Sequence, residues 1–146
     1  MTPGSNSFFL DTSSLVKLYV MESDSLALAA VAANARELVV SALAEFEFLS
    51  AIGRRSRDGD LTAKQYEQLR AAFYGDWSEV YVQQPLSDSV FAESRLLLST
   101  YRIKTLDAFQ LASAITYTTF TKERPLFITA DENLREVAKR EGFQVG

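Results

Sequence analysis

The chain has 146 residues and contains neither cysteine nor histidine. The absence of cysteine excludes disulfide bonds, a thiolate nucleophile and zinc–sulfur sites. The absence of histidine excludes a Ser-His-Asp triad, a histidine general base and histidine metal ligands. Any hydrolytic chemistry must therefore depend on carboxylates, hydroxyls, lysine or arginine, and a hard metal ion is their natural helper.

The sequence also lacks a long apolar span and a charged, apolar, small-residue leader, so we expect a cytoplasmic protein with no membrane association. A net charge of −4 argues mildly against a simple DNA-binding module, because such modules usually present a basic surface. The apolar fraction of 47% is sufficient for a hydrophobic core. Without repeats or a long linker, residues 1–146 are expected to form a single domain.

The order of apolar and polar residues predicts strands that alternate with helices. Strands are expected at 7–11, 37–41, 79–83, 125–131 and, at an edge, 143–145. Helices are expected at 14–23, 25–36, 42–60, 61–77, 86–101, 104–119 and 132–142. Thr62 and Gln65 have the spacing of a capping box. Such strands pair in parallel, so we expect an α/β fold, a three-layer α/β/α domain with a central parallel sheet of four to five strands.

Two aspartates directly follow strands. Asp11 ends "SFFLD" and Asp131 follows "LFIT", and open parallel sheets bind ligands beyond the carboxyl ends of their strands. Each aspartate also has a local explanation. Asp11 opens "DTSS", whose residue types cap helices, and Thr129 has capping-box spacing to Glu132. Local sequence leaves both roles open.

Asp107 lies in "TLDAFQLASAI", a helical segment with little polar surface. Leu111 and Ala114 share its side of the helix at the i+4 and i+7 positions. An ionised carboxylate on such a face is unfavourable unless a cation or hydrogen-bond donors meet it. The alternative is a first-turn position after Thr105, where an acid interacts favourably with the helix dipole.

The helix at 42–60 offers Glu45 and Glu47, which point to different faces because they are two residues apart. Glu47 shares its face with small or apolar neighbours such as Ser50 and Ala51, which let it approach the sheet edge. We favour Glu47, although spacing alone leaves both glutamates open as ordinary solvated charges.

Crowded carboxylates repel one another, and a divalent cation removes that repulsion. Ligands that offer only oxygen favour Mg²⁺ or Mn²⁺, which bind phosphate oxygens and lower the pKa of bound water. Basic residues flank the acids and are either candidate contacts to a phosphate backbone or solvated helix ends. They are Arg54, Arg55, Arg57, Arg102 and Lys104.

Four segments together resemble the PIN-domain family and, within it, the VapC toxins of type II toxin–antitoxin pairs. They are "FFLDTSSLVKLYV", "VVSALAEFEFLSAIGRR", "KTLDAFQLASAI" and "FITADENLREVAKREGFQV", which cover nearly the whole chain. The resemblance implies an Mg²⁺- or Mn²⁺-dependent endoribonuclease that acts as a toxin on RNA. It also implies a homodimer and a cognate VapB-like antitoxin that neutralises the enzyme.

The resemblance also assigns roles to individual residues. The catalytic, metal-binding carboxylates that it implies are Asp11, Glu47, Asp107 and Asp131, with supporting hydroxyls at Ser13 and Thr129. The "SALxxxE" register selects Glu47, and Glu45 is an additional acid beside it. Gln110 stands where many relatives carry histidine, which removes no metal ligand. With Asp11 directed at the metal, Thr12 or Ser13 is expected to cap the following helix.

Other protein classes fit less well. A phospho-acceptor receiver domain would need an aspartate after the third strand, and "EVYVQQP" supplies none. A haloacid-dehalogenase-type phosphatase would need an aspartate two residues after Asp11, where Ser13 stands. A PIN ribonuclease of RNA processing without a toxin role and a catalytically inert PIN interaction module remain alternatives. Retention of four mutually repelling acids argues against the inert module, and a neighbouring reading frame for an antitoxin would favour the toxin.

Overall fold

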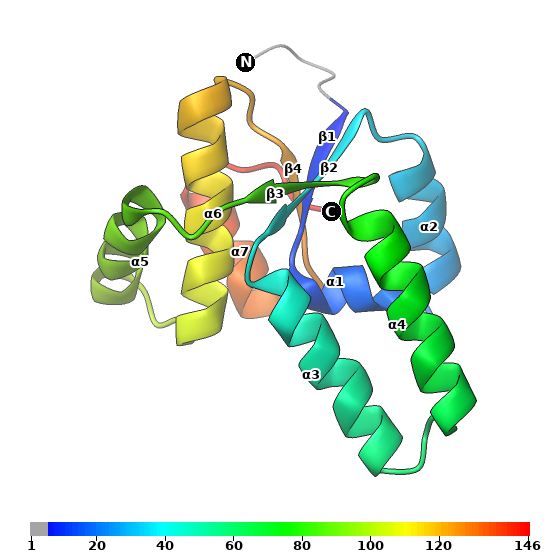
Figure 1. Cartoon of the computed structure of the whole chain (residues 1–146). Coiled ribbons are helices and arrows are strands. Elements are labelled where there is room, and N and C mark those ends of the chain that lie inside the picture. Colours follow the sequence, from blue (N-terminus) through cyan, green and yellow to red (C-terminus); the bar gives the residue numbers. More distant parts are fainter. Residues whose placement is uncertain (1–5) are drawn as a thin grey trace.

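The computed structural model describes residues 6–146, which form a parallel sheet flanked by helices (Figure 1). The sheet has four strands in the order β3-β2-β1-β4. Their bounds are β1 Ser7–Leu10, β2 Glu37–Ser41, β3 Tyr81–Gln84 and β4 Leu126–Ile128. All three strand pairs are parallel. Because parallel strands end at the same edge, residues that follow β1, β2 and β4 are brought together there.

Within the described residues six helices lie between strands along the chain, and a seventh follows β4. They are α1 Thr12–Lys17, α2 Ser25–Ala33, α3 Ala44–Arg57, α4 Ala63–Trp77, α5 Asp88–Thr100, α6 Thr105–Thr121 and α7 Glu132–Arg140. Helices α5, α6 and α7 lie on one side of the sheet and α1 to α4 on the other (Figure 1). None of these helices is long and apolar enough to cross a bilayer.

Two hydrophobic cores lie on opposite faces of the sheet. Phe9, Val39 and Phe127 belong to the core beneath α5, α6 and α7. Leu10 and Val40, the next residues along their strands, belong to the core beneath α1, α3 and α4. This alternation follows from the pleat of a strand, which directs successive side chains to opposite faces. The two buried faces confirm the predicted three-layer α/β/α fold.

Most predicted elements differ from the observed ones by a few residues at their ends, and two differ more. The helix expected at 14–23 is α1, which begins at Thr12 and ends at Lys17. Beyond it, the side chain of Tyr19 contacts Phe48 and its hydroxyl donates to Asp76 Oδ2 at 2.7 Å. The edge strand expected at 143–145 is a single bridge between Val145 and Phe127. The capping box at the start of α4 is present as predicted.

Helices α3 and α4 form an antiparallel pair that extends past the sheet (Figure 1). Phe48 of α3 stacks on Phe73 of α4 with ring centroids 4.0 Å apart, and both side chains are fully buried. Phe46, two residues earlier on α3, is 63% exposed. The buried pair fixes the rotation of α3 about its axis and therefore decides which glutamate of this helix faces the sheet edge.

Replacing Phe48 with alanine should destabilise the protein strongly, because the substitution leaves a cavity between α3 and α4. We expect Phe48→Ala to lower the free energy of unfolding by about 3–5 kcal/mol. The matched control, Phe46→Ala, should change it by no more than about 0.5 kcal/mol, since that side chain lies in solvent. Urea unfolding in EDTA measures both values, and similar losses would show that the helix is rotated differently.

Candidate active site

Asp11 is buried at the point where β1 meets α1. Its carboxylate Oδ1 accepts from the backbone N–H of Ser14 at 2.9 Å, and Oδ2 accepts from the Thr129 hydroxyl at 2.5 Å. The Ser13 hydroxyl donates to the same carboxylate, at 2.9 Å from Oδ1 and 3.0 Å from Oδ2. Asp11 itself therefore caps α1, and the expectation that Thr12 or Ser13 would do so is wrong. Thr12 is the first residue of α1, and its hydroxyl donates to Glu47 Oε1 on α3 at 3.0 Å.

Thr129 connects Asp11 to the second strand-end aspartate. While its hydroxyl donates to Asp11, its oxygen accepts from the backbone N–H of Asp131 at 3.1 Å. Asp131 is exposed and caps α7, accepting from the backbone N–H of Leu134 at 2.8 Å. The capping box predicted from Thr129 and Glu132 is thus wrong, because the cap lies two residues after Thr129. Both strand-end aspartates cap helices and face the same edge of the sheet.

The two glutamates of α3 separate as their spacing predicts. Oε1 of Glu47 accepts from the Thr12 hydroxyl at 3.0 Å and from Nε2 of Gln110 at 2.7 Å. Glu45 instead accepts from the Tyr74 hydroxyl of α4 at 2.8 Å. Glu47 is therefore directed at the sheet edge beside Asp11, whereas Glu45 connects α3 to α4.

Thr12 and Gln110 have roles that the sequence did not predict. Gln110 is buried on α6, and its Nε2 donates to Thr12 Oγ1 at 2.9 Å as well as to Glu47. Its Oε1 has no hydrogen-bond partner among the described residues. One feature of the sequence could have indicated this role for Gln110. It lies three residues after Asp107 and therefore shares the face of Asp107 on a largely apolar helix. Thr12 and Gln110 together satisfy Oε1 of Glu47 and hold the carboxylate in place.

Asp107 lies in the first turn of α6 and is half-buried. Burial raises its pKa above the ordinary value, and the negative charges of Asp131, Asp11 and Glu47 raise it further, while Lys104 opposes the change. The pKa of Glu47 is also raised, mainly by burial and in part by the charge of Asp11, against the hydrogen bonds from Gln110 and Thr12. The four predicted acids are therefore close enough to repel one another.

The chemistry of this acidic cluster, defined as Asp11, Glu47, Asp107 and Asp131, matches a hard divalent cation. All its donors are carboxylate oxygens, and their uncompensated repulsion is what such a cation relieves. Within residues 6–146, however, no three acidic side chains already converge into a ready-made metal site. The donor set fits Mg²⁺ or Mn²⁺, and binding would require the carboxylates to draw together.

The five basic residues predicted near the acids differ in their surroundings. Arg54 and Arg57 of α3 are exposed, and so are Arg102 and Lys104 before α6. Arg55 is half-buried and forms an ion pair with Glu22, with Nη2 and Oε1 2.6 Å apart. Arg55 is consequently less free than the others to meet a ligand.

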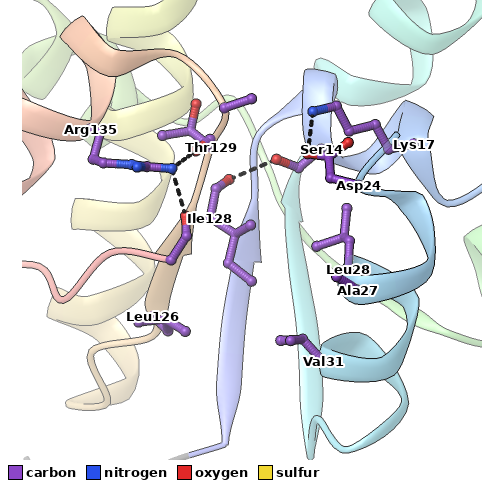
Figure 2. A pocket seen from close by; sticks show the side chains of 12 residues that line it. Ser14, Lys17, Asp24, Ala27, Leu28, Val31, Leu126, Ile128, Thr129 and Arg135 are labelled. Carbon is purple, nitrogen blue, oxygen red and sulfur yellow. Dashed lines mark hydrogen bonds and ion pairs between the residues drawn. The ribbon is translucent and has the colours of Figure 1, made fainter. Parts of the chain in front are cut away.

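A separate cavity of about 270 Å³ lies between α2 and β4 (Figure 2). Its lining is largely apolar and includes Leu28, Val31, Leu126 and Ile128, while Arg135 lies at one side. None of the acidic cluster lines it. It is therefore distinct from the edge of the sheet where the acids meet.

Residues 8–140 match the family model of the PIN domain, so the chain belongs to the PIN-domain family. No curated protein matches the sequence significantly. The match to the PIN-domain model confirms the family that the four sequence segments resemble, and it covers all four acids of the cluster.

Solved structures with the same fold include proteins from several bacteria. FitAcB from Neisseria gonorrhoeae is 15% identical with a TM-score of 0.68, over 94% of this chain and 95% of that one. VapBC2 from Rickettsia felis, bound to a promoter DNA fragment, is 14% identical with a TM-score of 0.62, over 96% and 97%. VapC20 of Mycobacterium tuberculosis, described as a toxin that cleaves the sarcin–ricin loop, is 14% identical with a TM-score of 0.66, over 93% and 95%. At these identities the likeness establishes a shared fold.

The raised pKa of Asp107 makes the metal-free protein sensitive to pH. Because the folded state binds this proton more tightly than the unfolded state, stability falls as pH rises from about 4 through the raised pKa. Asp107→Asn removes this loss. The free energy of unfolding of the variant, relative to wild type in EDTA, should therefore increase over that range and level off above it.

Asp88→Asn is the matched control for this measurement, since Asp88 is an exposed acid in the first turn of α5. It should show no such increase with pH. A stability difference between Asp107→Asn and wild type that stays constant across the range would contradict the repulsion within the acidic cluster.

Proposed function

We propose that this protein is a metal-dependent endoribonuclease that acts as the toxin of a toxin–antitoxin pair. The observation that carries the proposal is that four carboxylates, from four different segments, lie near enough to influence one another's charge at one edge of a PIN-fold sheet. Mutual repulsion of such groups destabilises the folded protein unless a cation offsets it. A group of acids that lowers the stability of the folded protein is best explained by a cation that the reaction needs.

Asp11, Glu47, Asp107 and Asp131 are the residues that would hold Mg²⁺ or Mn²⁺. A bound divalent cation lowers the pKa of water and binds phosphate oxygens, which is the chemistry that phosphodiester hydrolysis requires. The protein's own contribution is orientation. Hydrogen bonds from Ser13, Thr129 and the Ser14 N–H fix Asp11.

Orientation of Glu47 depends on Thr12 and Gln110, which both donate to its Oε1. The Oε2 atom is consequently the oxygen that remains for a cation. Exposed Arg54, Arg57, Arg102 and Lys104 lie on segments beside the acids and are proposed to contact the phosphate backbone of RNA, with Arg55 nearby.

The proposed partners are a VapB-like antitoxin and a second copy of the chain, and the proposed location is the cytoplasm. Structures that share this fold include a toxin–antitoxin complex from Klebsiella pneumoniae, at 19% identity and a TM-score of 0.60, as well as VapBC2. Exposed apolar side chains such as Phe46 on α3 and Leu96 on α5 supply surface for protein contacts.

Metal dependence is the first test of this function. RNA cleavage should be abolished by EDTA and restored by Mg²⁺ or Mn²⁺, because the proposed catalytic residues are all carboxylates, which would act by holding the cation that activates water. The products should carry a 5′-phosphate and a 3′-hydroxyl, which end-labelling and mass spectrometry can identify. Cyclic phosphate products formed in EDTA would refute the proposed mechanism.

The two glutamates of α3 provide a second test with a built-in control. Glu47→Gln should lower the initial rate of RNA cleavage by about 100-fold or more, since even residues that only orient metal ligands contribute about 10–100-fold. Glu45→Gln should leave the rate within a few-fold, because glutamine still accepts the hydrogen bond from Tyr74. The opposite result would mean that Glu45 is the residue that serves the site.

A further inference from the structure

The two carboxylate oxygens of Glu47 have different surroundings. Oε1 accepts from the Thr12 hydroxyl at 3.0 Å and from Nε2 of Gln110 at 2.7 Å, whereas Oε2 accepts no hydrogen bond within residues 6–146. A carboxylate oxygen has about two lone-pair sites, so two donors occupy Oε1 fully. Thr12 and Gln110 are only 8% and 2% exposed, so solvent has little access to replace either donor. Glu47 therefore offers one free oxygen to a cation.

Gln110 donates in this arrangement at the expense of its own acceptor. Because an ionised Glu47 has only acceptors, the amide of Gln110 must turn its NH₂ group toward it, and the same group donates to Thr12 at 2.9 Å. The other end of the amide, Oε1, is buried without a partner among the described residues. Buried polar atoms are nearly always paired, so an unpaired one calls for an explanation. The contacts supply it, since the amide is placed to hold Glu47 and Thr12.

Two other acids of the cluster are also held by protein donors. Oδ1 of Asp131 accepts from the backbone N–H of Leu134 at 2.8 Å, and its Oδ2 accepts no hydrogen bond within the described part of the chain. Both oxygens of Asp11 accept from protein donors. Like Glu47, these aspartates can give both oxygens to one cation only by losing hydrogen bonds to the protein.

The number of oxygens that each carboxylate supplies distinguishes Mg²⁺ from Ca²⁺. Mg²⁺ requires near-ideal octahedral coordination at about 2.0–2.1 Å and is usually bound through one or two carboxylates and several waters. Ca²⁺ takes about 6–8 oxygens at about 2.3–2.6 Å in flexible geometry, and it often binds a carboxylate through both oxygens. Carboxylates that are fixed in direction and limited to one free oxygen therefore suit Mg²⁺ and leave Ca²⁺ short of ligands.

We propose that Thr12 and Gln110 make the site selective for Mg²⁺ over Ca²⁺ by holding Glu47 as a ligand with one free oxygen. Both are positioning residues, since they act through Glu47 rather than by contact with the cation. The inference rests on the metal site of the proposed function and adds to it the residues that decide which cation the site accepts.

Competition between cations tests this selectivity in the absence of RNA. The electron paramagnetic resonance signal of free Mn²⁺ reports its binding to the protein, and displacement by Mg²⁺ or Ca²⁺ gives the Kd of each ion. Gln110→Met keeps the length of the side chain but removes its donor. Hydrogen bonds that orient metal ligands contribute about 10–100-fold to affinity. The Kd for Mg²⁺ should rise about tenfold and that for Ca²⁺ much less, so the ratio of the Ca²⁺ Kd to the Mg²⁺ Kd should fall several-fold to tenfold.

A second variant and a matched control complete the design. Thr12→Val removes the other donor to Glu47 with little change of shape and should lower the ratio in the same direction, so the test stands on either variant. Thr116→Val is the control, because Thr116 is 2% exposed on α6 and its Oγ1 is also buried without a partner within residues 6–146. It should leave the ratio unchanged. Thermal unfolding in EDTA establishes that the compared proteins are folded.

Failure of the selectivity and failure of the metal site give different results. If wild type binds Mg²⁺ but Gln110→Met and Thr12→Val keep its ratio, or Thr116→Val lowers the ratio equally, the inference alone is overturned. A wild type that binds Ca²⁺ as tightly as Mg²⁺ would have the same meaning. If wild type binds neither Mn²⁺ nor Mg²⁺, the proposed metal-dependent function is overturned together with the inference.

Discussion

Repulsion within the acidic cluster is the interaction on which the rest of the structure depends. Four carboxylates lie near one edge of the sheet, where burial and, in addition, their mutual charges raise the pKa values of Asp107 and Glu47. The protein offsets part of this repulsion with hydrogen bonds from hydroxyls, an amide and helix N-termini. Burying charge without such donors would be far more destabilising. The polar groups around the cluster, including Thr12, Gln110 and Thr129, are therefore understood as responses to these charges.

Two members of the acidic cluster are also helix caps. Asp11 caps α1 and Asp131 caps α7, so each carboxylate satisfies an N–H of the helix that follows its strand. The hydrogen bond from the helix N–H to the aspartate also fixes the direction of the carboxylate. Thr129 then links the two aspartates through its single hydroxyl. An aspartate in this position is a cap and a potential cation ligand at the same time, and the two roles do not compete because a carboxylate has several lone pairs.

The two cores hold the cluster in place from both sides. Alternate residues of β1 and β2 pack against opposite helical layers, so the strand ends cannot shift relative to α3 or α6 without disturbing a core. The stacking of Phe48 on Phe73 fixes α3 and directs Glu47 toward the edge. Arg54 lies seven residues after Glu47, two turns along the same face of α3, which brings an exposed cation to a pocket that Glu47 also lines. Packing of the two cores therefore determines where the acids of the cluster lie.

The sequence by itself determined the alternation of strands and helices, the parallel sheet, and the identity of the acids that the strand ends and helix faces carry. Periodicity and spacing are local properties, so they can be read from neighbouring residues. Only the structure decided that Asp11 rather than Thr12 or Ser13 caps α1, that Thr12 and Gln110 hold Glu47, and that Arg55 is paired with Glu22. Apart from the Asp11 cap, these contacts join residues 33 to 98 positions apart, as from Glu22 to Arg55 and from Thr12 to Gln110. They depend on strand register and helix rotation, which packing of the two cores fixes and no local pattern encodes.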